Sequence, residues 1–115
     1  MKIEISMGDF CDRHSILEIK QQKGLEVSKE LRQYQLSKPR NDVNYTHYIS
    51  ILHSINSQLW DLEDRKREHV ERYSKEESDT AFMITQLNDI RARVKKAIDK
   101  FYKSTITEIK SHNTV

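Results

Sequence analysis

A stretch in the middle of the chain carries the side chains most suited to binding chemistry. Along one side of a predicted helix lie Asn56, Trp60, Glu63, Asp64 and Arg67, at positions i, i+4, i+7, i+8 and i+11. An indole stacks on planar rings, a guanidinium binds phosphate or carboxylate, and amides and acids recognise polar edges. The stripe therefore predicts a binding site for a small, planar, anionic ligand.

A second polar stripe follows later in the sequence. Asn88, Arg91 and Lys95 share one helical face, with Asp89 beside them. If the two helices pack antiparallel, the stripes face each other and form a pocket. The plainer interpretation is a set of solvated ion pairs such as Glu63 with Arg67, each worth about 0.3 kcal/mol and without function.

The first stripe lies on a predicted helix over 45–73. The segment has no Gly or Pro, and its apolar residues follow a helical period: Ile49, Leu52, Ile55, Leu59, Leu62 and Val70. A helix of this length spans roughly 40 Å, so other helices must lie along it to bury its apolar face.

A second long helix is predicted over 81–102, after a break at 75–79 where Ser78 or Asp79 would cap it. Its predicted apolar positions are Met83, Leu87, Ile90, Val94, Ala97, Ile98 and Phe101. Two long helices joined by a short polar turn should pack antiparallel.

Shorter elements precede the central helix. Residues 2–5 alternate polar and apolar and are expected to form an extended lead-in, a strand that would pair with a second copy. Ser6 is placed to cap a helix that ends near Lys23, and Gly24 suits its left-handed C-terminal position.

A weaker helix is predicted over 25–37, and a loop over 38–43 follows it. Asp42 or Asn44 would cap the central helix. Residues 103–115 are expected to be a tail that folds back or frays.

Composition indicates one all-α domain over residues 1–115. The chain is 36% hydrophobic and 33% charged, with 2 Gly and 1 Pro, which favours an antiparallel bundle of three to four helices that completes its thin core by oligomerising. The net charge of +2 comes from interleaved charges and does not favour duplex nucleic acid. No apolar run reaches a membrane span and no signal peptide is evident, so a cytoplasmic protein without membrane partners is expected.

The polar residues also form a recognisable pattern. Four blocks occur in order: Ser6-x-Gly8-Asp9-x-x-Asp12-x-x-x-Ile16-Leu17-Glu18-Ile19-Lys20, Asn56-x-x-Leu59-Trp60-x-x-Glu63-Asp64, Asn88-Asp89-x-Arg91-x-x-x-Lys95 and Ser104-x-Ile106-x-Glu108-x-Lys110-Ser111. This pattern resembles a family of small bacterial and phage proteins known as a domain of unknown function. Asp9, Arg13 and His112 depart from its usual Glu, Lys and Tyr.

The resemblance implies no activity, but its signature coincides with the stripes and favours a site over packing. The candidate ligand-binding residues are Asp12, Lys20, Asn56, Trp60, Glu63, Asp64, Arg67, Asn88, Arg91, Lys95, Glu108 and Lys110. No catalytic residue, metal ligand or cofactor is assigned.

The leading hypothesis is non-enzymatic binding of a small anionic, nucleotide-derived ligand. Trp60 would stack on it, and Arg67, Arg91 and Lys95 would hold its phosphate. If the source is a phage, such binding would suit sequestration of a host signalling nucleotide as an anti-defence device.

Two further hypotheses stay open at this level. The first is a magnesium-dependent enzyme acting on a nucleotide or nucleotide-sugar, with Glu63, Asp64 and Asp89 around the metal. The second is a structural or adaptor module, in which the stripes form salt bridges between the chains of an oligomer.

Overall fold

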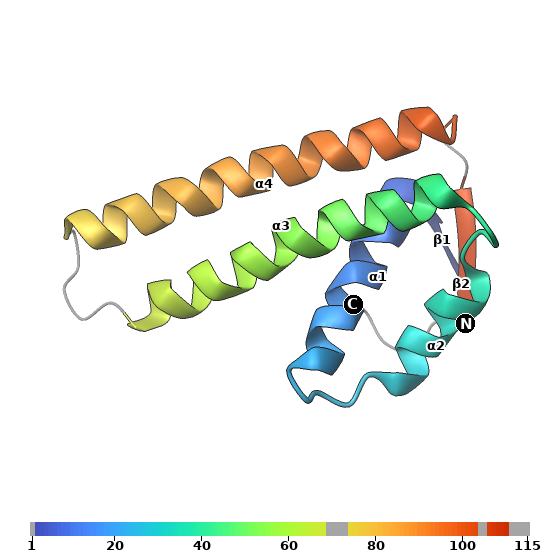
Figure 1. The fold of residues 1–115 in the computed structure, drawn as a ribbon, viewed down its shortest axis with the longest axis horizontal. Helices are drawn as coiled ribbons and strands as arrows, with labels where there is room; N and C mark the ends of the chain where they lie inside the picture. Colours follow the sequence, from blue (N-terminus) through green and yellow to red (C-terminus); the bar gives the residue numbers. More distant parts are fainter. Residues whose placement is uncertain (1, 69–73, 104–105, 111–115) are drawn as a thin grey trace.

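The computed structural model describes residues 2–68, 74–103 and 106–110. Within them the order of elements is β1 (Lys2–Ser6), α1 (Met7–Gln22), α2 (Ser28–Ser37), α3 (Val43–Glu68), α4 (Lys75–Phe101) and β2 (Ile106–Lys110). Helices α3 and α4 are the long central pair and run antiparallel (Figure 1). The predicted all-α bundle is confirmed, with one small sheet added to it.

Helix α1 crosses the α3/α4 pair at one end and contacts both helices, and α2 packs against α1 (Figure 1). The C-terminal half of α3 and the N-terminal half of α4 project beyond the other elements. The candidate site lies where α1 crosses the middle of α3.

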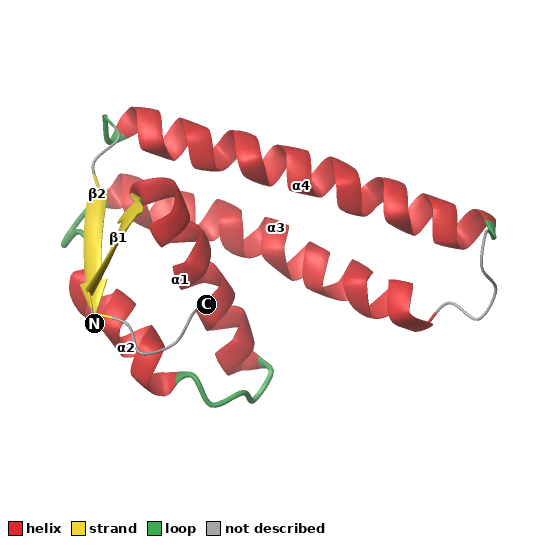
Figure 2. Cartoon of the chain, turned by 180° about the vertical axis from the view of Figure 1, so that it is seen from behind, coloured by secondary structure: helices red, strands yellow, loops and turns green. Residues whose placement is uncertain are grey.

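The two strands lie at the end of the bundle that holds α2 (Figure 2). They pair antiparallel, with Lys2 opposite Lys110 and Ser6 opposite Ile106. The prediction that the N-terminal strand pairs with a second copy is therefore wrong, because its partner is the C-terminal strand of the same chain. Through this pairing residues 106–110 fold back onto the bundle, which was one of the two predictions for the tail.

Capping explains where most helices begin and end. Ser6 Oγ accepts a hydrogen bond from the Asp9 amide, Asp42 Oδ1 accepts one from the Tyr45 amide, and Gly24 has φ 86°, so these caps are confirmed. The predicted cap at Ser78 or Asp79 is wrong. Helix α4 begins earlier, at Lys75, because Ser74 Oγ accepts from the Glu77 amide.

The core has two parts. The larger gathers side chains from β1 and all four helices, among them Phe10, Tyr34, Leu52 and Ile98, and the smaller joins α3 to Ile84 of α4. On α3 the predicted positions Leu52, Ile55, Leu59 and Leu62 are buried. Val70 lies outside the described residues.

The apolar face predicted for α4 is only partly correct. Ile98 is buried, but Met83, Ile90 and Phe101 are 45%, 46% and 48% exposed, and the helix turns Ile84 inward instead. Apolar residues on α4 occupy two neighbouring stripes. One is buried in the bundle, and the other meets it only in part, through Leu87 and Val94.

Candidate functional site

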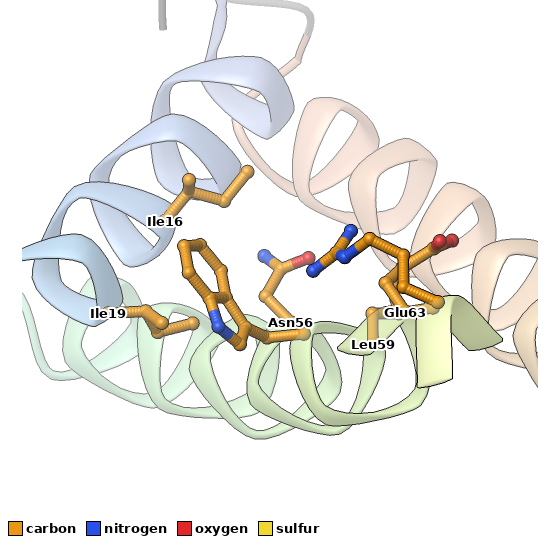
Figure 3. A pocket seen from close by; sticks show the side chains of 7 residues that line it. Ile16, Ile19, Asn56, Leu59 and Glu63 are labelled. Carbon is orange, nitrogen blue, oxygen red and sulfur yellow. The ribbon is translucent and has the colours of Figure 1, made fainter. Parts of the chain in front are cut away.

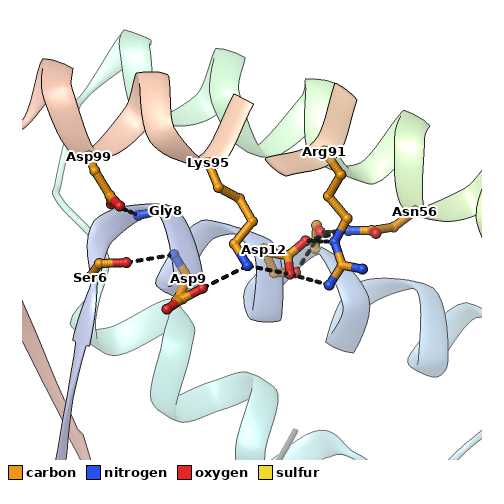
Figure 4. Close-up of polar contacts among 9 residues, drawn as sticks. Ser6, Gly8, Asp9, Asp12, Asn56, Arg91, Lys95 and Asp99 are labelled. Atoms are coloured by element: carbon orange, nitrogen blue, oxygen red, sulfur yellow. Dashed lines mark hydrogen bonds and ion pairs between the residues drawn. The ribbon is translucent and has the colours of Figure 1, made fainter. Parts of the chain in front are cut away.

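A buried carboxylate, Asp12, lies where α1, α3 and α4 meet. The residue is 3% exposed, and Arg91 binds both of its oxygens, with Nε at 3.0 Å from Oδ1 and Nη2 at 2.6 Å from Oδ2. Asn56 Nδ2 donates to Asp12 Oδ1 at 2.9 Å and to Ser15 Oγ at 2.8 Å. A buried carboxylate needs such partners, and here Asn56 comes from α3 and Arg91 from α4 (Figure 4).

The N-terminal turn of α1 is also tied to α4. Lys95 Nζ lies 2.8 Å from Asp9 Oδ1 and 3.8 Å from Asp12 Oδ2, and the Gly8 amide donates to Asp99 Oδ1 at 2.6 Å (Figure 4). The hydrogen bond with Lys95 lowers the pKa of the Asp9 carboxyl. The hydrogen bond with Asp12 raises the pKa of Arg91. Both cations are thus neutralised within the chain.

A groove of about 290 Å³ opens beside this cluster, between α1 and the middle of α3. It is lined by Ile16, Ile19, Asn56, Leu59, Trp60, Glu63 and Arg67. Ile16 and Ile19 come from α1 and stand across from the α3 side chains Asn56 and Leu59 (Figure 3). We call this feature the α1/α3 groove.

The groove combines an apolar interior with charges of both signs. Isoleucine and leucine side chains and the half-buried indole of Trp60 supply the apolar surface. Glu63 supplies a carboxylate, and Arg67 supplies a guanidinium that forms an ion pair with Asp64. Lys23, at the end of α1, places its ammonium 5.9 Å from the centre of the Trp60 ring.

A smaller hollow of about 190 Å³ lies on α4, lined by Asn88, Arg91, Ala92 and Lys95. The two predicted stripes therefore line separate hollows. The expectation that they form the opposite walls of one pocket is wrong, because α1 inserts at this level and presents Ile16 and Ile19 to the α3 stripe. Asn56, bound to Asp12, connects the groove to the Arg91 side of the cluster.

The structure brings most of the candidate residues together. Asp12, Asn56, Arg91 and Lys95 form one cluster with the hydrogen bonds above, while Trp60, Glu63 and Arg67 line the groove that Asn56 shares. These candidates therefore meet around the junction of α1, α3 and α4.

Four predicted residues lie outside these features. Lys20 does not line the groove, and Asp64 is at its edge as the ion-pair partner of Arg67. Glu108 and Lys110 belong to β2, where their backbones pair with Glu4 and Lys2. The side chains of these two strand residues lie outside what the structure describes.

Sequence reasoning missed several residues of the site. Ser15 joins Asn56 to the Asp12 backbone by accepting from the amide and donating to the carbonyl at 2.7 Å. Ile16 and Ile19 form a groove wall, although the apolar period of α1 predicts only that they face the core. The sequence contained a signal for this wall. Asp12, Ile16 and Ile19 are four and three residues apart and so share one helical face, which places the two isoleucines beside the polar cluster.

Among residues 2–68, 74–103 and 106–110 there is no group of three or more His, Cys, Asp or Glu side chains placed to hold a metal ion. Glu63, Asp64 and Asp89 are thus not gathered into the magnesium site of the enzyme hypothesis. No helix of the described chain combines the length and apolar character that crossing a membrane requires.

Comparison with known proteins supports one part of the resemblance noted in the sequence, membership of a family of unknown function. Searches of the curated proteins and of the solved structures found no match to this chain. The model of a family of unknown function, DUF6165, matches residues 1–115, and the chain therefore belongs to this family.

Proposed function

We propose that the protein binds a small, planar, nucleotide-derived anion in the α1/α3 groove and does not transform it. The observation that carries the proposal is the placement of Trp60 in one apolar groove with Asn56, Glu63 and Arg67. Stacking on an indole favours a flat ring, and a guanidinium at the same groove favours a phosphate or carboxylate attached to it.

Burial and charge refine the role of each residue. Arg91 and Lys95 already neutralise Asp12 and Asp9, so the anion is assigned to Arg67 and Lys23. Arg67 now pairs with Asp64, and Lys23 pairs with Asp61. The side chains of both pairs are about half exposed or more, so either cation can leave its carboxylate for a ligand anion at little cost in free energy. Glu63 is left to recognise the polar edge of the ring, together with the side-chain oxygen of Asn56, because the amide nitrogen of Asn56 already donates to Asp12 and Ser15.

The groove also limits the size of the ligand. Small-molecule pockets are roughly 300 to 1,000 Å³, so a groove of about 290 Å³ lies at the small end of that range. A mononucleotide fits this size better than a dinucleotide.

The adaptor hypothesis assigned the ion pairs of the stripes to contacts between chains. Asp12 with Arg91 and Asp9 with Lys95 are instead pairs within one chain that hold α1 against α4. The enzyme hypothesis stays an alternative, and incubation with candidate ligands in the presence and absence of magnesium separates it from binding.

The test is incubation of the purified chain with a pool of mono-, di- and cyclic nucleotides and nucleotide-sugars, with and without magnesium. Protein and filtrate are separated by filtration, the retained fraction is heat-denatured, and both are identified by mass spectrometry. A compound depleted from the filtrate and recovered intact supports binding. A new product would instead support the enzyme, and a pool that passes through unchanged would contradict the proposal.

Variants locate the binding event. Trp60→Ala should weaken retention by about 5- to 150-fold, because stacking of a base on an aromatic side chain is worth roughly 1–3 kcal/mol. Trp60→Phe should restore much of it. Gln58→Ala, an exposed change on the same helix outside the groove, is the matched control and should bind as the native chain does.

A further inference from the structure

Helix α4 exposes a row of large apolar side chains on its outer side. Met83, Ile90 and Phe101 are 45%, 46% and 48% exposed, and the Phe101 ring touches Tyr48 of α3 at one edge of the row. Phe82, 63% exposed, points roughly 100° away from Met83 and lies outside the row. Isolated exposed apolar residues are common, but several on the same side of one helix indicate an interaction surface. Helix α4 itself forms an edge of the molecule (Figure 1).

The spacing of the row is that of a helix that packs against another helix. Met83, Leu87, Ile90, Val94, Ala97 and Phe101 alternate steps of four and three residues, the heptad pattern of a coiled-coil seam. We call these six residues the α4 seam. The bundle takes the neighbouring face, with Thr80, Ile84 and Ile98 buried, and covers Leu87 and Val94 only in part.

The charges of α4 are divided between its halves. Residues 75–89 carry four carboxylates and one lysine, whereas residues 90–101 carry five cations and one carboxylate. A second α4 lying parallel to the first would bring like charges together along its whole length. A second α4 lying antiparallel would set each acidic half against a basic half. Arg91 and Lys95 already pair with Asp12 and Asp9 of α1, so the cations that would meet the partner's carboxylates are Arg93, Lys96 and Lys100.

We propose that the α4 seam is the interface of an antiparallel homodimer, with its two-fold axis near Ile90. In this register Ile90 meets Ile90 of the second copy, and Met83 meets the smaller Ala97. Asp79 comes near Lys100 of the second copy. The Met83–Ala97 and Asp79–Lys100 contacts each occur twice, because a two-fold interface is self-complementary. The axis that sets Ile90 against Ile90 and Met83 against Ala97 also sets the acidic half of each helix against the basic half of the other, which is why a second copy is the occupant assigned here.

The inference is independent of the proposed ligand. The seam shares no residue with the α1/α3 groove. A dimer that binds no nucleotide would contradict only the proposed function, and a monomer that binds one would contradict only the dimer.

The first test is the mass of the full chain in solution, by light scattering coupled to gel filtration over a range of concentrations. The native chain should show twice the 13.7 kDa of one protomer. Ile90→Asp puts two carboxylates at the axis in place of two apolar side chains and should raise the dissociation constant at least about 100-fold.

Leu36→Asp is the matched control. Leu36 is 65% exposed but lies on α2, away from the seam, and the variant should remain dimeric. Circular dichroism checks that both variants keep their helices. A monomeric native chain at all concentrations, or a dimer that Leu36→Asp dissociates and Ile90→Asp does not, would overturn the proposal.

The second test determines whether the two α4 helices of the dimer are antiparallel, in variants that keep Ile90. Met83→Cys and Ala97→Cys chains are treated with a short bis-maleimide, separately and as a mixture, against the native chain whose Cys11 is buried. Antiparallel pairing predicts cross-linked dimers mainly in the mixture. Cross-linking of each variant with itself would show parallel pairing, and its absence in every sample would contradict the seam as an interface.

Discussion

At the scale of single residues, Asp12 organises the junction of three helices. Its partners Asn56 and Arg91 lie 44 and 79 positions away in the sequence. Sequence reasoning could select Asp12 because it is a polar residue on the helical face that continues into Ile16 and Ile19. It could not name Arg91 as the partner, because periodicity assigns a residue to a face but not to a contact across the fold.

Replacing Asp12 by Ala should lower the free energy of unfolding by about 3 kcal/mol. The change leaves Arg91 with 29% side-chain exposure and no carboxylate, and it removes an acceptor of the Asn56 amide. Urea unfolding followed by circular dichroism measures the loss. Asp61→Ala removes an exposed carboxylate and should stay within about 0.5 kcal/mol of the native chain.

The same measurement tests the assignment of the partner. If Asp12 and Arg91 act as a pair, Arg91→Ala costs much less in the Asp12→Ala chain than in the native one. Costs that simply add in the double variant would show that the pair does not account for the stability of the junction.

His14 makes stability depend on pH. It is 3% exposed, its Nδ1 lies 2.5 Å from the Tyr45 hydroxyl, and burial lowers its pKa from 6.5 to about 4. A base with a lowered pKa in the folded state binds fewer protons than in the unfolded state, so stability falls as pH drops below 6.5. From pH 7 to pH 5 this contribution is about 2 kcal/mol.

The comparison is urea unfolding of the native chain and His14→Gln at both pH values. Burial raises the pKa of the Glu18 carboxyl, which acts in the opposite direction but equally in both chains. The stability difference between them should therefore shift by about 2 kcal/mol between pH 7 and pH 5. An unchanged difference would mean that His14 does not stay neutral in the folded protein.

At the scale of elements, the contact between α1 and α4 depends on a residue without a side chain. A Cβ at Gly8 would lie well inside contact distance of the Lys95 carbonyl oxygen and close to Asp99 Oδ1. Backbone atoms cannot move aside as a flexible side chain would. The helix start at Ser6 thus serves a second purpose, since it delivers Gly8 to α4 where the Asp99 carboxylate accepts from its amide.

Gly8→Ala should therefore destabilise the protein by about 2 kcal/mol, through the displacement of α1 from α4. Helix propensity alone predicts the opposite sign, because Ala is favoured over Gly by about 1 kcal/mol in a helix. The melting temperature decides between them. A variant as stable as the native chain would show that the two helices have room to separate.

Gly24→Ala is the contrast. Gly24 has φ 86° and nothing within 4 Å of an added Cβ, so only the left-handed backbone is strained. A cost of about 1 kcal/mol is expected there.

Element prediction from the sequence succeeded where one signal dominated. The α3 core face and the caps at Ser6 and Asp42 follow from a single apolar period and from side-chain oxygens that accept free amides. For α4 the signal was divided, because Met83 and Ile84 point to different stripes and periodicity does not say which one meets the bundle. Ser74 was missed as its cap since the polar run after it has equally good capping residues.

At the scale of the whole molecule, the groove results from an angle between helices that the sequence does not encode locally. The α3 stripe was recognisable from residue types, but the wall opposite it is α1 rather than α4. Three contacts hold α1 against α4 at that angle: Gly8 with Asp99, Asp12 with Arg91, and Asp9 with Lys95. The α1/α3 groove therefore holds Trp60, Asn56, Glu63 and Arg67 together. Arg91 and Lys95 instead line the separate hollow on α4 and pair with Asp12 and Asp9.

The groove carries its own optical probe, because Trp60 is the only tryptophan of the chain. Its half-buried indole lines the α1/α3 groove, so a ring that stacks on it should quench its fluorescence. The most direct test of binding in the groove is titration of the native chain with purine and pyrimidine mononucleotides and cyclic nucleotides while this emission is recorded.

Binding in the groove predicts saturable quenching by at least one of these compounds. In Arg67→Gln the half-saturation concentration should rise about tenfold, and in Gln58→Ala it should not change. Emission that stays constant with every compound, or that is quenched equally in Arg67→Gln and the native chain, would contradict the assignment of the α1/α3 groove as a nucleotide-binding site.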